Sequence, residues 1–352
     1  MNKRLESMIF NKFIYKFFIL IIFLSIAYST SYQQFRYFDI NNPRGITDTR
    51  SYIKMAEGDY GVSPTHKFRF LIPKTVSILK PLFGNINSTN INNINESKSN
   101  ENLKLRFWIV NIGLTTLTAY LLYNFQKLIG LNEIGSFLGS LIFLTSRNTI
   151  VNTGVPLVDA GQNFAIILLV YFMQLKDSLK ISFALPLIIL MKETLYPLVF
   201  ITLLKKNFRN YSVIISLAIS ISLVIISRHY ISNISEVSVE YDISLYDNFK
   251  IHSGKLLNNL TDFSFRKIHN LIFYSFSFFT FAALIGFFIN LKERVIKIDK
   301  EVFLLIPYCM IISVLVLSPG KIIFMTFPII IPYSVIFLLK IFSIEFNKFK
   351  EI

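Results

Sequence analysis

The sequence predicts an all-α fold: a polytopic bundle of membrane helices with about ten crossings. Of the 352 residues, 53% are hydrophobic and only 16% are charged, whereas soluble chains carry about 25% charged residues. Apolar runs recur near the length that crosses a bilayer, and Lys and Arg cluster beside these runs, as they do in loops next to a membrane. We therefore treat residues 1–352 as a single integral membrane domain.

The charge balance does not indicate a nucleic-acid partner. The chain has 36 Lys and Arg against 21 Asp and Glu, a net charge of +15, but it contains no zinc-finger spacing and no basic helix with interleaved aromatic residues. Its single cysteine, Cys309, lies in an apolar run. An intrachain disulfide and a cysteine-based metal site are therefore excluded.

The predicted spans are too long and too evenly apolar for half-buried strands or for the strands of a barrel. The first run follows several lysines, as the apolar part of a signal peptide does. We interpret it as a retained first helix, because the later spans need its crossing for consistent alternation. The runs occupy residues 17–28, 107–125, 134–144, 160–175, 181–204, 213–226, 271–291, 302–317 and 322–342.

The short loops predict the orientation, since their Lys and Arg mark the cytoplasmic side. The cations around residues 176–180 and 205–209 share that side only if residues 181–204 enter and return as a hairpin of two short helices. Both termini are then cytoplasmic. The polar stretches 29–106 and 229–270 become two large extracytoplasmic loops.

The first of these loops contains a predicted short helix and a predicted disordered insertion. Residues 47–57 form the helix, which Asp48 opens as an N-cap and Gly58 closes. Residues 85–102 are rich in Asn and Ser and have little to bury, so we predict disorder there.

Between these two segments, residues 68–83 have apolar side chains at helical spacing, opposed by Arg69, Lys74 and Lys80. This pattern is typical of an amphipathic helix lying in the membrane interface. We expect a kink or a restart at Pro73.

Ionisable residues next to apolar runs are the strongest functional signal. Glu193 lies deep inside one run, and Asp159 lies at the start of another. Such groups are costly at membrane depth and usually face a cavity or a partner. Lys192 precedes Glu193, and because helical neighbours point about 100° apart, we expect the two to pair with different groups. A structural ion pair or an exposed polar turn is the alternative interpretation.

Basic residues also stand at the outer ends of two spans. Arg147, Arg228 and His229 could hold a phosphate there, and interfacial anchoring is the alternative. No nucleotide-binding loop, metalloprotease motif, serine elbow or CxxC pair occurs. The sequence therefore identifies no certain cofactor, and it leaves a divalent metal open without supporting one.

Two further features are assigned to structure. Gly135 and Gly139 form a GxxxG pattern, which favours helix packing. His66, His252 and His269 show no metal-ligand spacing, so we interpret them as surface or interfacial residues.

Three short motifs, taken in order, carry a resemblance to a known family. Asp48 and Tyr52 form a D-x-x-x-Y pattern that precedes the stretch 69–73 (RFLIP), Asp159 opens a span, and Lys192 lies in a polar segment between two short apolar stretches. Across residues 17–204 this order resembles the GT-C class of polytopic glycosyltransferases, in particular the branch akin to bacterial protein mannosyltransferases and lipopolysaccharide-modifying sugar transferases. Thr49 stands where that family frequently has Glu, which leaves metal assistance unsupported.

The resemblance implies transfer of a sugar from a polyprenyl-phosphate donor to a glycan, lipid or protein acceptor, at the extracytoplasmic face of a bacterial inner membrane. It implies Asp48 as catalytic base, Asp159 as a second catalytic carboxylate, and Lys192 as the first candidate for binding phosphate. The other substrate-binding residues expected are Tyr52, Arg69, Arg147, Glu193, Arg228 and His229.

Two other functions remain open from the sequence. A transporter or flippase for a lipid-linked or anionic substrate would use Lys192 and Glu193 within the membrane. A noncatalytic protein of envelope assembly would use Asp48 and Asp159 only as helix caps.

Overall fold

A computed structural model describes residues 3–40, 46, 48–82, 95–234, 269, 275–315 and 319–342. Every regular element in these ranges is helical, which confirms the predicted all-α class. Within them, three helices are long and apolar enough to cross a membrane: α1 (Lys3–Tyr37), α5 (Asn95–Ile129) and α11 (Tyr211–Ile234). A fourth span results if α6 (Glu133–Thr145) and α7 (Arg147–Gly154), which bend by 58° at Ser146, count as one.

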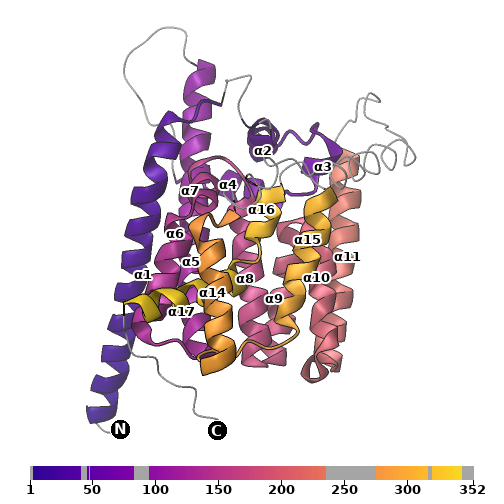
Figure 1. Cartoon of the computed structure of the whole chain (residues 1–352). Helices are drawn as coiled ribbons and strands as arrows, with labels where there is room; N and C mark the ends of the chain where they lie inside the picture. The colour runs from indigo at the N-terminus through magenta and orange to yellow at the C-terminus, as the bar shows by residue number, and fades with distance from the viewer. Residues whose placement is uncertain are drawn as a thin grey trace.

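Shorter apolar helices complete an upright bundle (Figure 1). The helix α5 packs against α1, α6 and α8 (Asp159–Leu175), and α8 packs against α9 (Ser178–Met191). Each of these helices overlaps an apolar run of the sequence; α1 and α5 extend well beyond their runs, and α9 covers the first part of its run. The contacts confirm a helical bundle, while the ten crossings are not confirmed by helix length.

The predicted hairpin in residues 181–204 is present. After α9, Lys192 adopts an extended conformation, with φ −165° and ψ 142°. The chain continues through a 3-10 turn into α10 (Tyr196–Phe200) and further 3-10 turns. Lys205 then donates a hydrogen bond of 2.6 Å to the carbonyl of Met173, at the end of α8. Because α9 starts just after α8 ends, the chain has returned to the level at which α9 began.

The loops that the charge pattern assigns to one side do lie at one end of the bundle. The backbone N–H of Lys297 donates to the carbonyl of Ile129 over 2.9 Å, and the Gln174 amide donates to the carbonyl of Lys297 over 3.1 Å. Lys205 forms an ion pair with Asp299. These contacts join the segments that follow α5, α8, α10 and α14.

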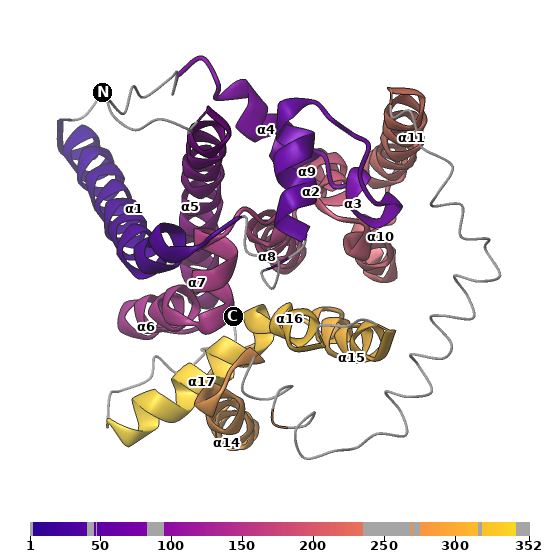
Figure 2. The same cartoon turned by 90° about the horizontal axis from the view of Figure 1, so that it is seen from above.

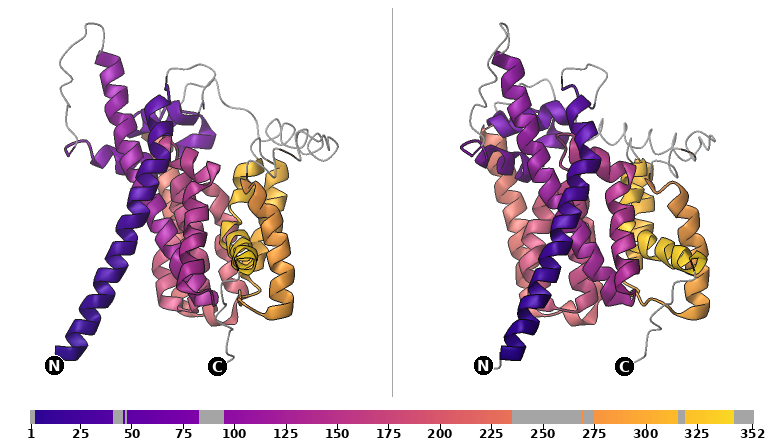
Figure 3. Two further views of the ribbon diagram at one scale, coloured as in Figure 1. Left: turned by 60° about the vertical axis from the view of Figure 1, so that its left-hand side comes forward. Right: turned by 90° about the vertical axis from the view of Figure 1, so that its left-hand side faces the viewer.

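The last predicted span, residues 322–342, is wrong as a single helix. The chain forms α16 (Pro319–Phe324), breaks at Met325 and Thr326, and restarts as α17 (Phe327–Ile341). Pro328 lies in the first turn of α17, where a proline that lacks an N–H begins a helix more readily than it continues one. Figure 3 shows α17 running across the bundle, packed on α14 (Phe278–Glu293) and α6.

Close backbone approach needs glycine at two of these helix crossings. A Cβ on Gly139 would lie 2.0 Å from the Gln126 amide of α5, which agrees with the predicted packing role of the GxxxG pattern. A Cβ on Gly286 of α14 would lie 1.8 Å from the carbonyl oxygen of Tyr333 in α17. Neither crossing leaves room for a side chain.

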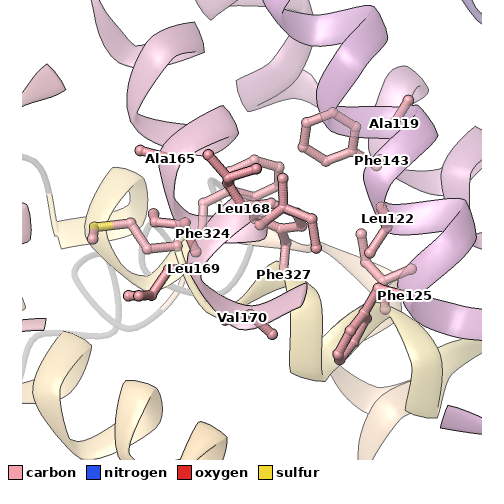
Figure 4. Close-up of a cluster of buried hydrophobic side chains, with 14 of the residues drawn as sticks. Ala119, Leu122, Phe125, Phe143, Ala165, Leu168, Leu169, Val170, Phe324 and Phe327 are labelled. Atoms are coloured by element: carbon pink, nitrogen blue, oxygen red, sulfur yellow. The ribbon is translucent and has the colours of Figure 1, made fainter. Parts of the chain in front are cut away.

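An aromatic core ties the C-terminal helices to the rest of the bundle. Phe143 of α6 lies 4.8 Å from Phe327 and 6.1 Å from Phe324, measured between ring centroids. Figure 4 shows these rings between apolar side chains of α5 and α8, among them Leu122 and Leu168. In a bundle of membrane helices, such contacts contribute through close van der Waals packing.

The first loop differs from its prediction in two segments. The helix α2 (Asp48–Glu57) is confirmed, and it ends at Gly58 with a φ of +97°. The interfacial helix predicted for residues 68–83 is shorter, because α4 spans only Leu71–Ile78. Pro73 lies in its first turn, where its missing N–H costs nothing, so no kink arises.

The second difference lies in the Asn-rich segment. Its last residues, 95–102, are helical and begin α5, so the predicted disorder is wrong for them. The helix α5 extends past the apolar run into these residues, because helical hydrogen bonding propagates from its packed part. The preceding residues 85–94 lie outside the described ranges, as does most of the second predicted loop, residues 229–270.

Candidate functional site

Six polar side chains from distant parts of the sequence meet at the end of the bundle that α2, α3 (Pro64–Lys67) and α4 cover. In Figure 2, which views this end, α8 lies between α4 and α16. We call these six side chains the charged cluster; its members are Tyr52, Arg69, Asp159, Lys192, Glu193 and Lys321.

Asp159 is the centre of one half of the cluster. It is the first residue of α8, where a carboxylate is favoured by the partial positive charge of the helix N-terminus. Its Oδ1 lies 2.6 Å from Nζ of Lys192, and its Oδ2 lies 3.5 Å from Nζ of Lys321. The carboxylate is buried and is held between two ammonium groups that come from α16 and from the end of α9.

Lys192 and Glu193 point to different partners, as their spacing predicts. The extended conformation of Lys192 interrupts the helix between α9 and the following 3-10 turn. Lys192 therefore reaches Asp159, while Glu193 accepts hydrogen bonds from Nε of Arg69 at 2.8 and 3.0 Å and from Nη2 of the same guanidinium.

Arg69 links the first loop to the hairpin. Its Nη1 donates to the Tyr52 hydroxyl over 2.9 Å. Burial disfavours the guanidinium charge, but the hydrogen bonds to Glu193 and the negative charge there raise the pKa of Arg69 above its ordinary value. Burial also raises the pKa of Tyr52. Both groups thus keep their protons, and α2 is fixed over the cluster through them.

Asp48 lies beside the cluster, and His66 contacts both Asp48 and the cluster member Tyr52, whose ring centroid is 5.5 Å from that of the imidazole. Oδ1 of Asp48 is 3.5 Å from Nε2 of His66, whose Nδ1 is 3.2 Å from the Ser51 hydroxyl. Burial lowers the pKa of His66, and the Asp48 charge opposes that shift. A neutral imidazole with its proton on Nε2 would point that proton toward the Asp48 carboxylate, which can only accept. The side chain of Asp48 is 38% exposed, in contrast to the buried Asp159.

Arg228 reaches the same end of the bundle from α11. Its guanidinium carbon lies 4.7 Å from the ring centroid of Phe68 and 5.7 Å from that of Tyr196. Cations are attracted to aromatic faces at such distances. Close by, the Tyr308 hydroxyl donates to the carbonyl of Thr194. These contacts join α11 and α15 (Leu305–Leu315) to the hairpin next to Glu193.

Two predicted site residues do not join the cluster. Arg147 begins α7, which packs against α1 and α5, and its side chain is exposed. His229 is exposed on α11, and its Nε2 lies 3.2 Å from the Asn233 amide nitrogen one turn further on. The structure therefore gathers seven of the nine predicted residues: Asp48, Tyr52, Arg69, Asp159, Lys192, Glu193 and Arg228.

Two residues of this region were not predicted for the site. His66 was interpreted as a surface or interfacial residue without a site role, but it is half-buried beside Asp48, where the packing of α3 on α2 places it. Lys321 was passed over, although its position at the start of a long apolar run is the same signal that identified Asp159.

The electrostatics separate groups that are already paired from groups that are still accessible. Arg69 and Lys192 are each held by a carboxylate at short range, whereas Lys321 is 32% exposed and lies 3.5 Å from Asp159. Asp48 is the more exposed carboxylate. Within the described residues, no group of three or more His, Cys, Asp or Glu side chains lies close enough to hold a metal ion.

In comparisons with known proteins, no protein-family model matches the chain, and no curated protein matches it either.

Proposed function

We propose that the chain is a GT-C-like glycosyltransferase that moves a sugar from a polyprenyl-phosphate donor to a glycan, lipid or protein acceptor. The observation that supports this most is that an accessible carboxylate, Asp48, lies beside the charged cluster, which includes the ammonium groups of Lys192 and Lys321, at one end of an apolar bundle. A lipid-linked donor needs no nucleotide-binding domain, and the sequence contains no such motif.

In this reaction Asp48 is the general base. One of its oxygens faces the His66 imidazole, and the other accepts the proton of the acceptor hydroxyl. The acceptor oxygen bonds to the anomeric carbon, the bond from that carbon to the phosphate oxygen breaks, and the lipid phosphate leaves with the electron pair. Base assistance of this kind contributes about 10²- to 10⁴-fold in rate.

The leaving phosphate needs a cation that is not already paired with a carboxylate at short range. Lys192, the first candidate from the sequence, is held by Asp159 at 2.6 Å, so we assign it to shaping the site. Lys321 is the better candidate because it is partly exposed and loosely paired. Positioned cations stabilise negative charge that develops in a transition state.

The proposal includes the topology. The shorter apolar helices and the hairpin would complete about ten crossings, with both termini cytoplasmic and the charged cluster at the extracytoplasmic face of a bacterial inner membrane. The loops that carry the Lys and Arg residues lie together at one end of the bundle, and the charged cluster lies at the other end. This separation supports the arrangement.

The test is sugar transfer in membranes that contain the chain, with a polyprenyl-phosphate sugar as donor. Asp48→Asn should lower transfer by at least about 100-fold, because the amide cannot take a proton. Glu57→Gln, at the exposed far end of the same helix, is the matched control and should behave as wild type. Equal activity of both variants at equal expression would refute the role of Asp48.

Transport is the second candidate function, and one observation favours it. Polar contacts join the same two groups of helices at both ends of the bundle: Lys321 to Asp159 at one end, and Asp299 to Lys205 at the other. Paired contacts of this kind could open alternately. Uptake of a lipid-linked sugar into reconstituted vesicles, without transfer, would support transport over transfer.

A further inference from the structure

Two amide side chains, one helical turn further into the bundle than the charged cluster, have no hydrogen-bond partner among the described residues. Gln162 and Asn163 lie in the first turns of α8, with 3% and 5% of their surface exposed. Neither side chain donates or accepts a hydrogen bond within the described part of the chain. Their amide atoms are not among the fully enclosed unpaired atoms of the described residues, so they keep contact with solvent and are open to a ligand.

Helix geometry places both amides on the side of the cluster. Gln162 and Asn163 follow Asp159 by three and four residues, so the three share one face of α8. Gly161 faces the other way, where a Cβ would meet Met191 and Ile72 within 3.0 Å. The shared face is the one that Lys321 of α16 approaches, since Lys321 pairs with Asp159.

The polar character of this face ends after the amides. Ile166 and Val170, seven and eleven residues after Asp159, continue the same stripe and are buried and apolar. In Figure 4, Val170 lies in the apolar cluster with Phe324 and Phe327. The amides therefore form a polar layer between the ion pairs and the apolar core.

We infer that Gln162 and Asn163 bind the hydroxyl groups of the donor sugar ring, next to the phosphate that Lys321 receives. This assignment rests on the proposed function. An amide supplies both a donor and an acceptor, which matches a hydroxyl group. Charged side chains already fill the layer above, and apolar side chains fill the layer below, so a neutral polar group is the ligand that fits.

The thermal stability of variants distinguishes an amide that binds a ligand from one that stabilises the fold. Replacing an unpaired buried amide by an apolar residue of similar size does not cost a hydrogen bond in the folded protein. Gln162→Leu and Asn163→Leu should therefore unfold at the same temperature as the wild type or higher. Gln126→Leu is the control, because Gln126 also lacks a hydrogen-bond partner among the described residues but lies fully enclosed against Gly139, away from the cluster.

The binding measurement uses the purified full-length chain with a polyprenyl-phosphate hexose, compared with the same polyprenyl phosphate without sugar. Wild type and Gln126→Leu should gain more thermal stability from the hexose lipid than from the bare lipid. Gln162→Leu and Asn163→Leu should lose this difference, and the KM for the donor should rise at least about tenfold.

The outcomes are distinguishable. If the wild type responds to the sugar and both α8 variants respond equally, or if both variants unfold at lower temperature with an unchanged KM, the amides are structural and the inference is wrong. If the wild type responds to neither lipid and transfers no sugar, the proposed function fails, and the inference fails with it.

Discussion

Nζ of Lys192 lies 2.6 Å from Oδ1 of Asp159, a contact that closes 33 residues of sequence and joins the break after α9 to the first turn of α8. Both side chains are about one-tenth exposed. Because the pair is buried, water cannot readily take the place of a side chain that is removed. Breaking the pair should therefore lower the free energy of unfolding by a measurable amount.

Removal of one member of this pair should destabilise the chain strongly. Lys192→Met leaves the Asp159 carboxylate with only the longer contact to Lys321, and a broken buried pair costs about 3–5 kcal/mol. The double variant with Asp159→Asn should recover part of that loss. Chemical unfolding of the purified protein in detergent provides the measurement.

The exposed pair of Lys180 with Asp177, at the opposite end of the bundle, is the control. Lys180→Met should leave the unfolding midpoint close to that of the wild type, because water replaces an exposed partner. An equal loss in Lys180→Met and Lys192→Met would contradict the account of the buried pair.

The Arg69 contacts require a guanidinium. Arg69→Lys keeps the charge, but a single ammonium cannot serve both oxygens of Glu193 and the Tyr52 hydroxyl together. We expect a loss of stability of about 1–3 kcal/mol. Tyr52→Phe removes one of these contacts and should cost less than Arg69→Lys. The reverse order, measured by unfolding, would show that Tyr52 and not Arg69 anchors α2.

The lowered pKa of His66 predicts how the free energy of unfolding depends on pH. Burial holds its pKa in the folded protein below the ordinary value of 6.5, so the unfolded chain binds a proton first as the pH falls. The stability due to this group is present above pH 6.5, and it is lost as the pH falls from 6.5 through the lower pKa of the folded state.

His66→Gln removes this contribution, because glutamine does not titrate. The variant should lose less stability than the wild type between pH 7 and pH 5, as measured by thermal unfolding across that range. His229→Gln, on the exposed part of α11, should keep the wild-type profile. A His66→Gln profile that parallels the wild type would assign the acid sensitivity to another group.

Two glycines give opposite predictions for the same substitution. Gly286→Ala places a methyl group 1.8 Å from the Tyr333 carbonyl oxygen, and overpacking of this kind typically costs about 1–3 kcal/mol. Gly113→Ala, inside α5, meets no atom within 4 Å and should stabilise the helix by about 0.5–1 kcal/mol. No loss of stability in Gly286→Ala would show that the helix crossing relaxes, and a loss in Gly113→Ala would contradict the open space beside that residue.

Local sequence signals predicted the elements that depend on a few neighbouring residues. The end of α2 at Gly58 follows from a glycine with positive φ, and the hairpin at Lys192 follows from the sidedness of the flanking cations. The last apolar run was misjudged because hydropathy does not register that Pro328 begins a new helix. The helical residues 95–102 were missed because composition does not register that a neighbouring packed helix extends through a polar segment.

The sequence by itself determined the all-α class, the apolar helices and the small set of ionisable residues beside them, because each of these depends on composition and local periodicity. Only the tertiary structure decided the pairings: Lys192 with Asp159, Arg69 with Glu193, and His66 with Asp48. It also brought in Lys321 and left out Arg147 and His229. The physical reason is that an ion pair depends on distance in space, and these distances are set by how the loop helices α2, α3 and α4 and the helices α8, α9 and α16 are arranged.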